Sequence, residues 1–284
     1  MPPVPLIDYI WYHAVNDQHK LNSVLASSAK QTQPKQQLYA IEADIIYSEA
    51  KGQSVMGHPP QVDGELTLAS LLQQLDLAVF QQLRSTSTAD ATACNILKLD
   101  FKSMKALQSS MHDIKNYLKE LPKYLHQYVW INADILAGPG GSEGEDLQPK
   151  FDAVEFMGLL TAETFRHTTL SIGWTTSLND IRAPYTLDMI DEMITLLRRY
   201  PNKNITFPIR ATSFRTSWEA LSRLYDNDVD KNKKWTLTLW WSLTSDQHKL
   251  TKEDMNWIHE LLESGGVSAL PNRTYYDLVN FSPP

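Results

Sequence analysis

The sequence lacks the signatures of thiol, serine-elbow and zincin chemistry. Cys94 is the single cysteine among 284 residues, so no disulfide can form within the chain. No G-x-S-x-G, C-x-x-C or H-E-x-x-H motif occurs. These absences argue against an α/β-hydrolase nucleophile, a dithiol redox centre and a zinc protease.

Positive charge and long apolar runs are also scarce. The chain carries 26 basic and 33 acidic side chains, a net charge of −7. Proteins that bind extended nucleic acids or anionic membranes are usually basic, so we expect neither as a partner. No apolar run approaches membrane-spanning length, and the start MPPVPLIDYI has no signal-peptide pattern. The sequence alone therefore indicates a cytoplasmic protein without a transmembrane segment.

Short β-rich runs alternate with amphipathic helical stretches from end to end. The expected strands are 7–15, 39–47, 95–102, 128–136, 168–174, 204–211, 234–241 and 274–279, with 267–270 competing for the last place. The expected helices are 66–84, 103–126, 186–200, 213–225 and 251–263.

Eight β units with helical crossovers predict a (β/α)₈ TIM barrel, in one domain over residues 1–284. The chain stops soon after the eighth run, so we expect the closing helix to be missing or truncated. A doubly wound open sheet is the main rival. Its dinucleotide-binding form would need a Gly-rich turn where this chain has HAVNDQHK.

The stretch YAIEADIIY (39–47) places two acids in an otherwise apolar strand. Glu42 and Asp44 point to one side, and Ile41, Ala43 and Ile45 point to the other, because side chains alternate along a strand. Repulsion and desolvation penalise such a pair unless positive charge lies nearby. In several strands polar residues gather toward the carboxyl end, which is where barrels hold their active sites.

A third acid, Asp100, ends the neighbouring expected strand, so we expect three carboxylates to converge at one rim. An all-oxygen set suits one hard divalent cation, Mg²⁺ or Ca²⁺. The alternative is that the acids form ion pairs with Lys98, Lys102 and Arg210. The sequence leaves both possibilities open.

Two histidines flank this acidic group in the sequence. His13 ends the first expected strand, and His58 lies in the loop MGHPP after the second. Such a pair could act as general base and general acid, although a lone histidine is more often structural.

Other polar and aromatic residues at the strand ends could contact a substrate. Lys102 could neutralise a phosphate oxygen, and Lys98 is better placed to tie the carboxylates together. Trp174 and Trp240 could wall a pocket, although large aromatics are more often core residues. The candidate substrate-binding residues are Lys102, Lys98, Asn132, Asp134, Trp174, Arg210 and Trp240.

Eight longer motifs run in order along the chain and are jointly specific. They are WYHAVN (11–16), IEADI (41–45), GHPP (57–60), KLDFK (98–102), VWINADILAGP (129–139), SIGWTT (171–176), TFPIRA (206–211) and TLTLW (236–240). In these motifs the chain resembles the menorin family, single-domain type. More distantly it resembles the phospholipase C-like phosphodiesterases, which include glycerophosphodiester phosphodiesterases and spider-venom phospholipase D toxins.

The resemblance implies a metal-dependent phosphodiesterase on a (β/α)₈ barrel with one divalent cation. It assigns acid–base roles to His13 and His58, metal ligation to Glu42, Asp44 and Asp100, and a phosphate contact to Lys102. Ala14 and Val15 stand where the superfamily has the rest of an HRG tripeptide, so the headgroup stays open. The implied substrate is a phosphodiester small molecule, a lipid headgroup or a short oligonucleotide end.

The same resemblance supports a second class of function. Menorins are associated with extracellular cues in neuronal patterning and with photoreceptor maintenance. The alternative is therefore a non-catalytic binding module, extracellular and with cell-surface protein partners, that keeps a vestigial cation site.

Overall fold

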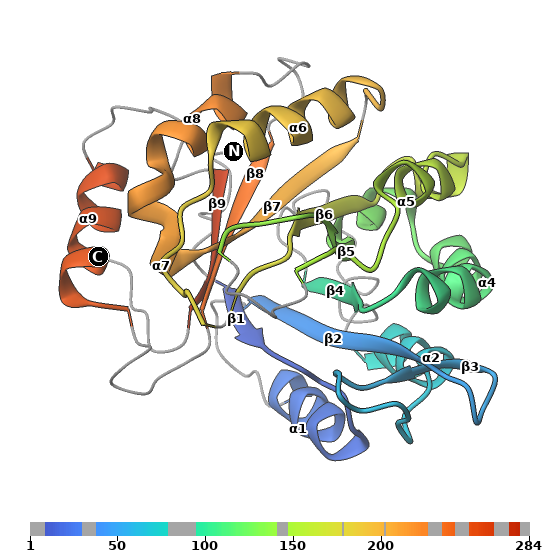
Figure 1. Ribbon diagram of the computed structural model, residues 1–284. Coiled ribbons are helices and arrows are strands. Elements are labelled where there is room, and N and C mark those ends of the chain that lie inside the picture. Colours follow the sequence, from blue (N-terminus) through green and yellow to red (C-terminus); the bar gives the residue numbers. More distant parts are fainter. Residues whose placement is uncertain are drawn as a thin grey trace.

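Parallel strands form a nearly closed barrel, and the helices lie on its outside (Figure 1). The computed structural model describes residues 9–29, 38–78, 95–140, 147–177, 179–201, 203–226, 235–241, 250–263 and 273–278. Within these ranges, eight parallel strands follow the order β1-β2-β4-β5-β6-β7-β8-β9, and the last contacts the first. The predicted TIM barrel is confirmed.

The barrel strands lie close to their expected positions. They are β1 (Tyr9–Tyr12), β2 (Leu38–Ser48), β4 (Ile96–Phe101), β5 (Val129–Leu136), β6 (Thr169–Trp174), β7 (Asn204–Arg210), β8 (Thr236–Trp241) and β9 (Thr274–Leu278). A further strand, β3 (Gln53–Met56), pairs antiparallel with the end of β2 and was not predicted. The competing run 267–270 lies outside the described residues.

Helices fill most of the crossovers between the strands. They are α1 (Gln18–Ala29), α2 (Leu68–Ala78), α4 (Met104–Glu120), α5 (Ala153–Leu159), α6 (Leu187–Arg198), α7 (Ala211–Phe214), α8 (Trp218–Asp226) and α9 (Lys252–Glu263). Short 3₁₀ turns span Lys123–Tyr128, Glu163–Phe165 and Arg215–Ser217. Helices α1 and α5 were not predicted, and the expected helix over 213–225 is three shorter pieces. No described helix is both long and apolar enough to cross a bilayer.

Side-chain caps set where several helices begin. Ser103 accepts a hydrogen bond from the backbone N–H of Ala106 and so starts α4 directly after β4. Asp152 and Thr186 cap α5 and α6 in the same way. Each cap fixes the residue at which its helix begins.

The two faces of the strands pack into two different apolar layers. Ile41, Ala43 and Ile45 belong to the large core between strands and helices. A smaller cluster of Ala40, Ile96 and Trp130 fills the barrel interior, where Tyr9, Trp11 and Tyr275 pack against it. This aromatic floor closes the bottom of the barrel, so the polar residues that follow it along each strand face the open end.

Trp130 is the centre of this floor and provides a test of it. It is 1% exposed, and its ring centroid lies 4.8 Å from that of Tyr275 and 6.0 Å from that of Trp11. We expect Trp130→Ala to lower the free energy of unfolding by about 3–5 kcal/mol in urea denaturation, because it leaves a large cavity. Tyr124→Ala, at a position 54% exposed, is the control and should change it by under about 1 kcal/mol. Equal losses in the two variants would contradict the packing described.

Candidate active site at the carboxyl ends of the strands

A cavity of about 430 Å³ opens at the carboxyl ends of the barrel strands. Every barrel strand except β6 contributes at least one lining residue, either within the strand or just after its end. The loop after β6 contributes Thr176. The lining residues are His13, Ala14, Glu42, Asp44, His58, Lys98, Asp100, Lys102, Asn132, Asp134, Thr176, Pro208, Trp240 and Asp277. Ten of the twelve predicted site residues are therefore in one place.

His13 is held between two carboxylates from the two ends of the barrel sheet. Its Nδ1 lies 2.9 Å from Oε2 of Glu42, and its Nε2 lies 2.5 Å from Oδ1 of Asp277. Burial alone would lower the pKa of His13, but the two carboxylates outweigh it and raise the pKa to about 10. The pKa of Asp277 is also raised, chiefly by its burial, so the pair of His13 and Asp277 retains a proton at neutral pH.

Lys98 neutralises the other oxygen of Glu42. Its Nζ lies 2.7 Å from Oε1, and the two residues are register partners on β2 and β4. Burial opposes ionisation of both groups, yet their attraction raises the pKa of Lys98 and, with His13, lowers the pKa of Glu42. Glu42 is thus a carboxylate between two cations.

Lys102 lies between the other two acids of the predicted metal site. Its Nζ is 2.8 Å from Oδ1 of Asp44 and 2.7 Å from Oδ2 of Asp100. Asp44 and Asp100 are register partners, so their carboxylates would repel each other without this ammonium. Burial opposes the charge of Lys102, but the two acids raise its pKa.

Two asparagines satisfy the remaining oxygens of these acids. Asn16 donates to Oδ2 of Asp44 at 2.8 Å, and its own Oδ1 accepts the Asp44 backbone N–H at 2.9 Å. Asn132 donates to Oδ1 of Asp100 at 2.7 Å and accepts from the hydroxyl of Ser171 at 2.6 Å. Asn132, which the sequence placed among the candidate substrate-binding residues, therefore positions Asp100.

The expected ligand set of Glu42, Asp44 and Asp100 stays a prediction, and in this structure the oxygens of the three acids have internal partners. All six of its carboxylate oxygens already accept from a lysine, histidine or asparagine. The ammonium of Lys102 stands between Asp44 and Asp100, where a cation was expected. The ion pairs that the sequence offered as an alternative are present, with Lys98 and Lys102 as the partners.

A different group of side chains could hold a metal ion. His13, Glu42 and Asp277 offer one ligand atom each, and these atoms lie within 4.8 Å of one another. Asp277 is 1% exposed, and its Oδ1 contacts His13 without hydrogen-bond geometry. A buried carboxylate oxygen without a hydrogen bond fits a ligand role. One imidazole and two carboxylates suit Zn²⁺ or Mn²⁺ as well as the expected Mg²⁺ or Ca²⁺.

His58 lies at the mouth of the cavity and is exposed. Its Nδ1 lies 2.7 Å from the backbone oxygen of Pro59, and since a carbonyl only accepts, Nδ1 must carry a proton. In the neutral ring, Nε2 then carries the free electron pair. This tautomer of His58 is the one whose Nε2 can accept a proton.

Asp134 differs from the other acids of the cavity. Among the described residues it has no hydrogen bond or ion pair, and it is exposed to the cavity. Its pKa is raised to about 7, chiefly by burial away from bulk water and then by Asp100, against the opposing effect of Lys102 and Lys98. Asp134 is an uncompensated carboxyl group in an otherwise paired site.

Trp240 lines the cavity as predicted, but Trp174 and Arg210 do not. Trp174 is 1% exposed and packs in the core against Tyr185, with ring centroids 5.4 Å apart. Arg210 is also 1% exposed and donates to the backbone oxygens of Ser177 and Asp180. The structure corrects both assignments, since Arg210 braces the loop after β6 instead of facing a substrate.

Two residues of the site were missed. Asp277 gave no sequence signal because TYYDLV offers a single acid, and its partner His13 lies at the other end of the chain. Asn16 stands inside the motif WYHAVN, so its position in that motif was a signal that we did not use. Both residues act through contacts with residues that are distant in the sequence, Asp277 with His13 and Asn16 with Asp44.

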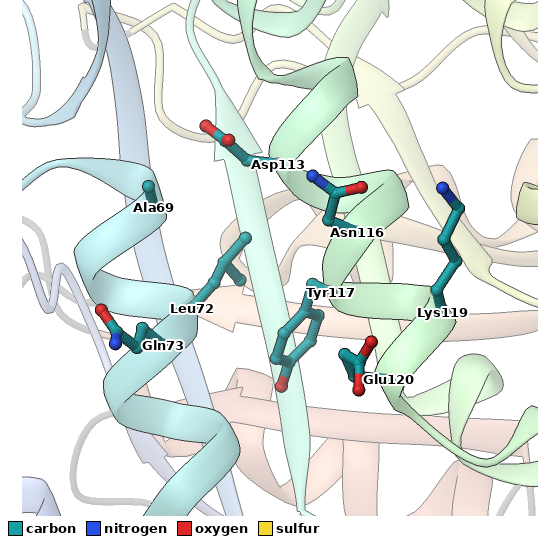
Figure 2. Close-up of a pocket in the computed structure, with 8 residues that line it drawn as sticks. All are labelled: Ala69, Leu72, Gln73, Asp113, Asn116, Tyr117, Lys119 and Glu120. Atoms are coloured by element: carbon teal, nitrogen blue, oxygen red, sulfur yellow. The ribbon is translucent and has the colours of Figure 1, made fainter.

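A second hollow lies outside the barrel, between α2 and α4 (Figure 2). Its volume is about 390 Å³, and Leu72 and Tyr117 face each other across it. Asp113, Lys119 and Glu120 lie along its α4 side. No cluster of histidines or carboxylates with metal-ligand spacing occurs there among the described residues, so the barrel cavity is the candidate active site.

The chain as a whole is similar to known proteins. The model of the Menorin N-terminal domain matches residues 6–280. The chain belongs to the menorin family. It is 29% identical over 275 residues to human Protein FAM151B, an alignment that covers 95% of this chain and 82% of that menorin relative. The family resemblance seen in the sequence is confirmed.

Two solved structures resemble this menorin chain weakly. Catalytic-site mutants of active domain 2 of chitinase from Pyrococcus furiosus share 13% identity at a TM-score of 0.48, covering 97% of this chain and 85% of that one. Dihydroorotase from Campylobacter jejuni shares 12% identity at a TM-score of 0.39, covering 96% and 69%. We draw no functional conclusion from either.

Replacing Lys102 tests whether its positive charge compensates the negative charges of Asp44 and Asp100 in this menorin. Lys102→Met leaves Asp44 and Asp100 facing each other, so we expect the free energy of unfolding to fall by about 3–5 kcal/mol. Added Ca²⁺ should restore part of the melting temperature in the variant, because the cleared space then suits a cation.

The matched control is Lys105→Met, which removes an exposed ion pair with Glu49 and a cation–π contact with the Tyr47 ring. It should lower the melting temperature far less than the Lys102 substitution does and should not respond to Ca²⁺. A Lys102 variant as stable as this control would contradict the role given to Lys102.

Proposed function

We propose that this menorin cleaves a phosphodiester bond in the barrel cavity by histidine acid–base chemistry. The observation that carries the proposal is the pair of imidazoles at one cavity. His13 lies between two carboxylates that raise its pKa to about 10, and the Nδ1–H of His58 donates to the backbone oxygen of Pro59, which makes Nε2 its proton-accepting atom. Phosphodiester cleavage needs a base for the attacking hydroxyl and an acid for the leaving oxygen.

His58 is the proposed base. Its Nδ1–H donates to Pro59, so Nε2 is the atom that would take the proton from water or from a neighbouring hydroxyl of the substrate. Its exposure at the cavity mouth gives the attacking group access.

His13 is the proposed acid. Both ring nitrogens carry protons when Glu42 and Asp277 are ionised, and one of these protons would pass to the leaving oxygen. A pKa of about 10 keeps the acid loaded across neutral pH. The same two carboxylates fix the plane of the ring.

Lys102 supplies the proposed phosphate contact. An ammonium has three N–H donors, and Asp44 and Asp100 take two of them, which leaves one for a phosphoryl oxygen. Its side chain is 20% exposed, whereas that of Lys98 is 5% exposed. Lys98 is therefore assigned to holding Glu42 in place.

The triad of His13, Glu42 and Asp277 would hold a divalent cation in this scheme. When bound, the cation would stabilise negative charge on the phosphoryl oxygens. Metal ligation needs a nitrogen of His13 without a proton, whereas the proposed acid role needs a doubly protonated ring. Activity with and without metal therefore reports which role His13 plays.

One observation favours a second candidate, a binding module without catalysis. The oxygens of Glu42, Asp44 and Asp100 are all occupied by internal partners, as in a network that stabilises a scaffold. On this alternative the cavity rim would present a surface to a cell-surface protein.

The test is a panel of phosphodiesters, comprising glycerophosphodiesters, lysophospholipids and short oligonucleotides. Each is assayed in EDTA and with Mg²⁺, Ca²⁺, Mn²⁺ or Zn²⁺, using phosphorus NMR to identify products. We expect turnover of at least one substrate, with kcat lowered about 10²–10⁴-fold in His13→Gln and His58→Gln.

His112→Gln is the matched control, because His112 lies on α4 outside the barrel, where it contacts Asn116. It should retain full activity. Absence of turnover in the wild type under every metal condition, with the protein folded, would refute catalysis and favour the binding module.

A further inference from the structure

A third hollow, of about 330 Å³, lies at the amino ends of β5 and β6, at the opposite end of the barrel from the candidate active site. The end of α4, the 3₁₀ turn before β5 and the segment before β6 form its walls. The polar side chains that line it belong to Lys119, Lys123, His126, Glu163, Thr164 and His167. Two lysines and two histidines therefore share one small hollow in a chain whose net charge is −7.

His126 is the buried polar side chain of this hollow. It is 7% exposed, and its Nε2 lies 2.8 Å from the backbone oxygen of Leu118 and 3.2 Å from that of Leu121. Nε2 must carry a proton, because carbonyl oxygens only accept. In the neutral ring Nδ1 is then an acceptor. It has no hydrogen bond among the described residues, although solvent reaches it.

Positive side chains lie around this acceptor. Lys123 precedes His126 by three residues in the same 3₁₀ turn, and side chains at that spacing lie on one face of the turn. Lys119 lies in the last turn of α4 and lines the same hollow. Glu163 is the one acid among the described lining residues, and Arg166 pairs with it at 3.4 Å. The two ammonium groups therefore give the hollow an excess of positive charge.

Buried contacts hold both walls of the hollow in place. The hydroxyl of Thr169 on β6 donates to the backbone oxygen of Gln127 at 2.7 Å, which ties the turn before β5 to the sheet. The buried ammonium of Lys203 donates to the backbone oxygens of Leu160 and Phe165 on the other wall. A ligand would therefore enter a preformed hollow and would not have to order it.

We infer that this hollow binds a hydrogen phosphate ion. The phosphate oxygens would accept from the ammonium groups of Lys119 and Lys123, and the P–OH group would donate to Nδ1 of His126. Sulfate has no hydroxyl group at neutral pH, so it would leave Nδ1 of the neutral ring without a donor. The inference is independent of the proposed phosphodiesterase, since the hollow lies at the other end of the barrel.

A divalent cation is the competing occupant. A histidine that ligates a metal usually donates its other ring N–H to a carbonyl or a carboxylate, as His126 does to a carbonyl. His167 and Glu163 line the same hollow, but the three side chains do not have metal-ligand spacing in the part of the chain that the structure describes. Lys119 and Lys123 would also repel a cation. The cation is therefore an outcome of the test.

The experiment is a titration of the folded full chain with inorganic phosphate in EDTA, followed by NMR of the imidazole resonances. His126→Gln and His167→Gln assign the two reporters. We expect both resonances to shift until the site is saturated, and sulfate to need about a tenfold higher concentration. His112, on α4 outside the hollow, should not shift, and His58 reports separately on the barrel cavity.

Two variants test the contacts. His126→Gln keeps an N–H donor near the position of Nε2 but removes Nδ1, so we expect the fold to persist and phosphate to bind about tenfold more weakly, read at His167. Lys123→Gln should weaken phosphate binding to a similar extent.

Lys105→Gln is the matched control, the same change as Lys123→Gln but at the start of α4. It should keep the wild-type affinity for phosphate. The inference would be overturned by resonances that do not saturate, by equal affinity for sulfate, or by unchanged affinity in both hollow variants. Saturable shifts of His126 and His167 with Zn²⁺ in EDTA-free buffer, without any response to phosphate, would assign the hollow to a metal instead.

Discussion

The imidazolium of His13 between Glu42 and Asp277 is the interaction on which the site depends. Strand β1 ends just before His13, Glu42 lies on β2, and Asp277 lies on β9, the last strand of the barrel. The contact therefore joins the first and last strands where the barrel closes. It also fixes the one ring that the proposed chemistry uses as an acid.

Charge compensation extends from this contact across half of the cavity. Glu42 is shared with Lys98, and Lys102 joins Asp44 to Asp100. A buried charge costs several kcal/mol when unpaired, so each lysine stabilises two strands through the acid it contacts. Asp134 is left outside this scheme, since it has no hydrogen bond or ion pair among the described residues.

The His13 contacts also make stability depend on pH. The pKa of His13 in the folded chain is about 10, above its ordinary value of 6.5. The folded state therefore binds the proton more tightly than the unfolded state does. This contribution to stability is complete below pH 6.5 and is lost as the pH rises through 10.

Much of the fold could be predicted because strand alternation and strand count are local features of the sequence. The pair Glu42 and Asp44 identified the polar face of β2, and parallel strands in register then required Asp100 to lie nearby. What could not be predicted is which neighbour each charge meets. Lys102 reaches between two acids rather than toward the solvent, and Arg210 turns outward to a loop. These pairings depend on side-chain rotamers and on contacts between distant parts of the chain, which the spacing of residues in the sequence does not determine.

The most direct test of the account is the protonation state of His13, followed by NMR of the imidazole carbons and nitrogens in EDTA. His13→Gln assigns the resonance among the eight histidines of the chain. The account predicts a ring that stays doubly protonated through neutral pH and titrates near pH 10. A ring that titrates near pH 6.5 would show that Glu42 and Asp277 do not hold it, and would contradict the central claim.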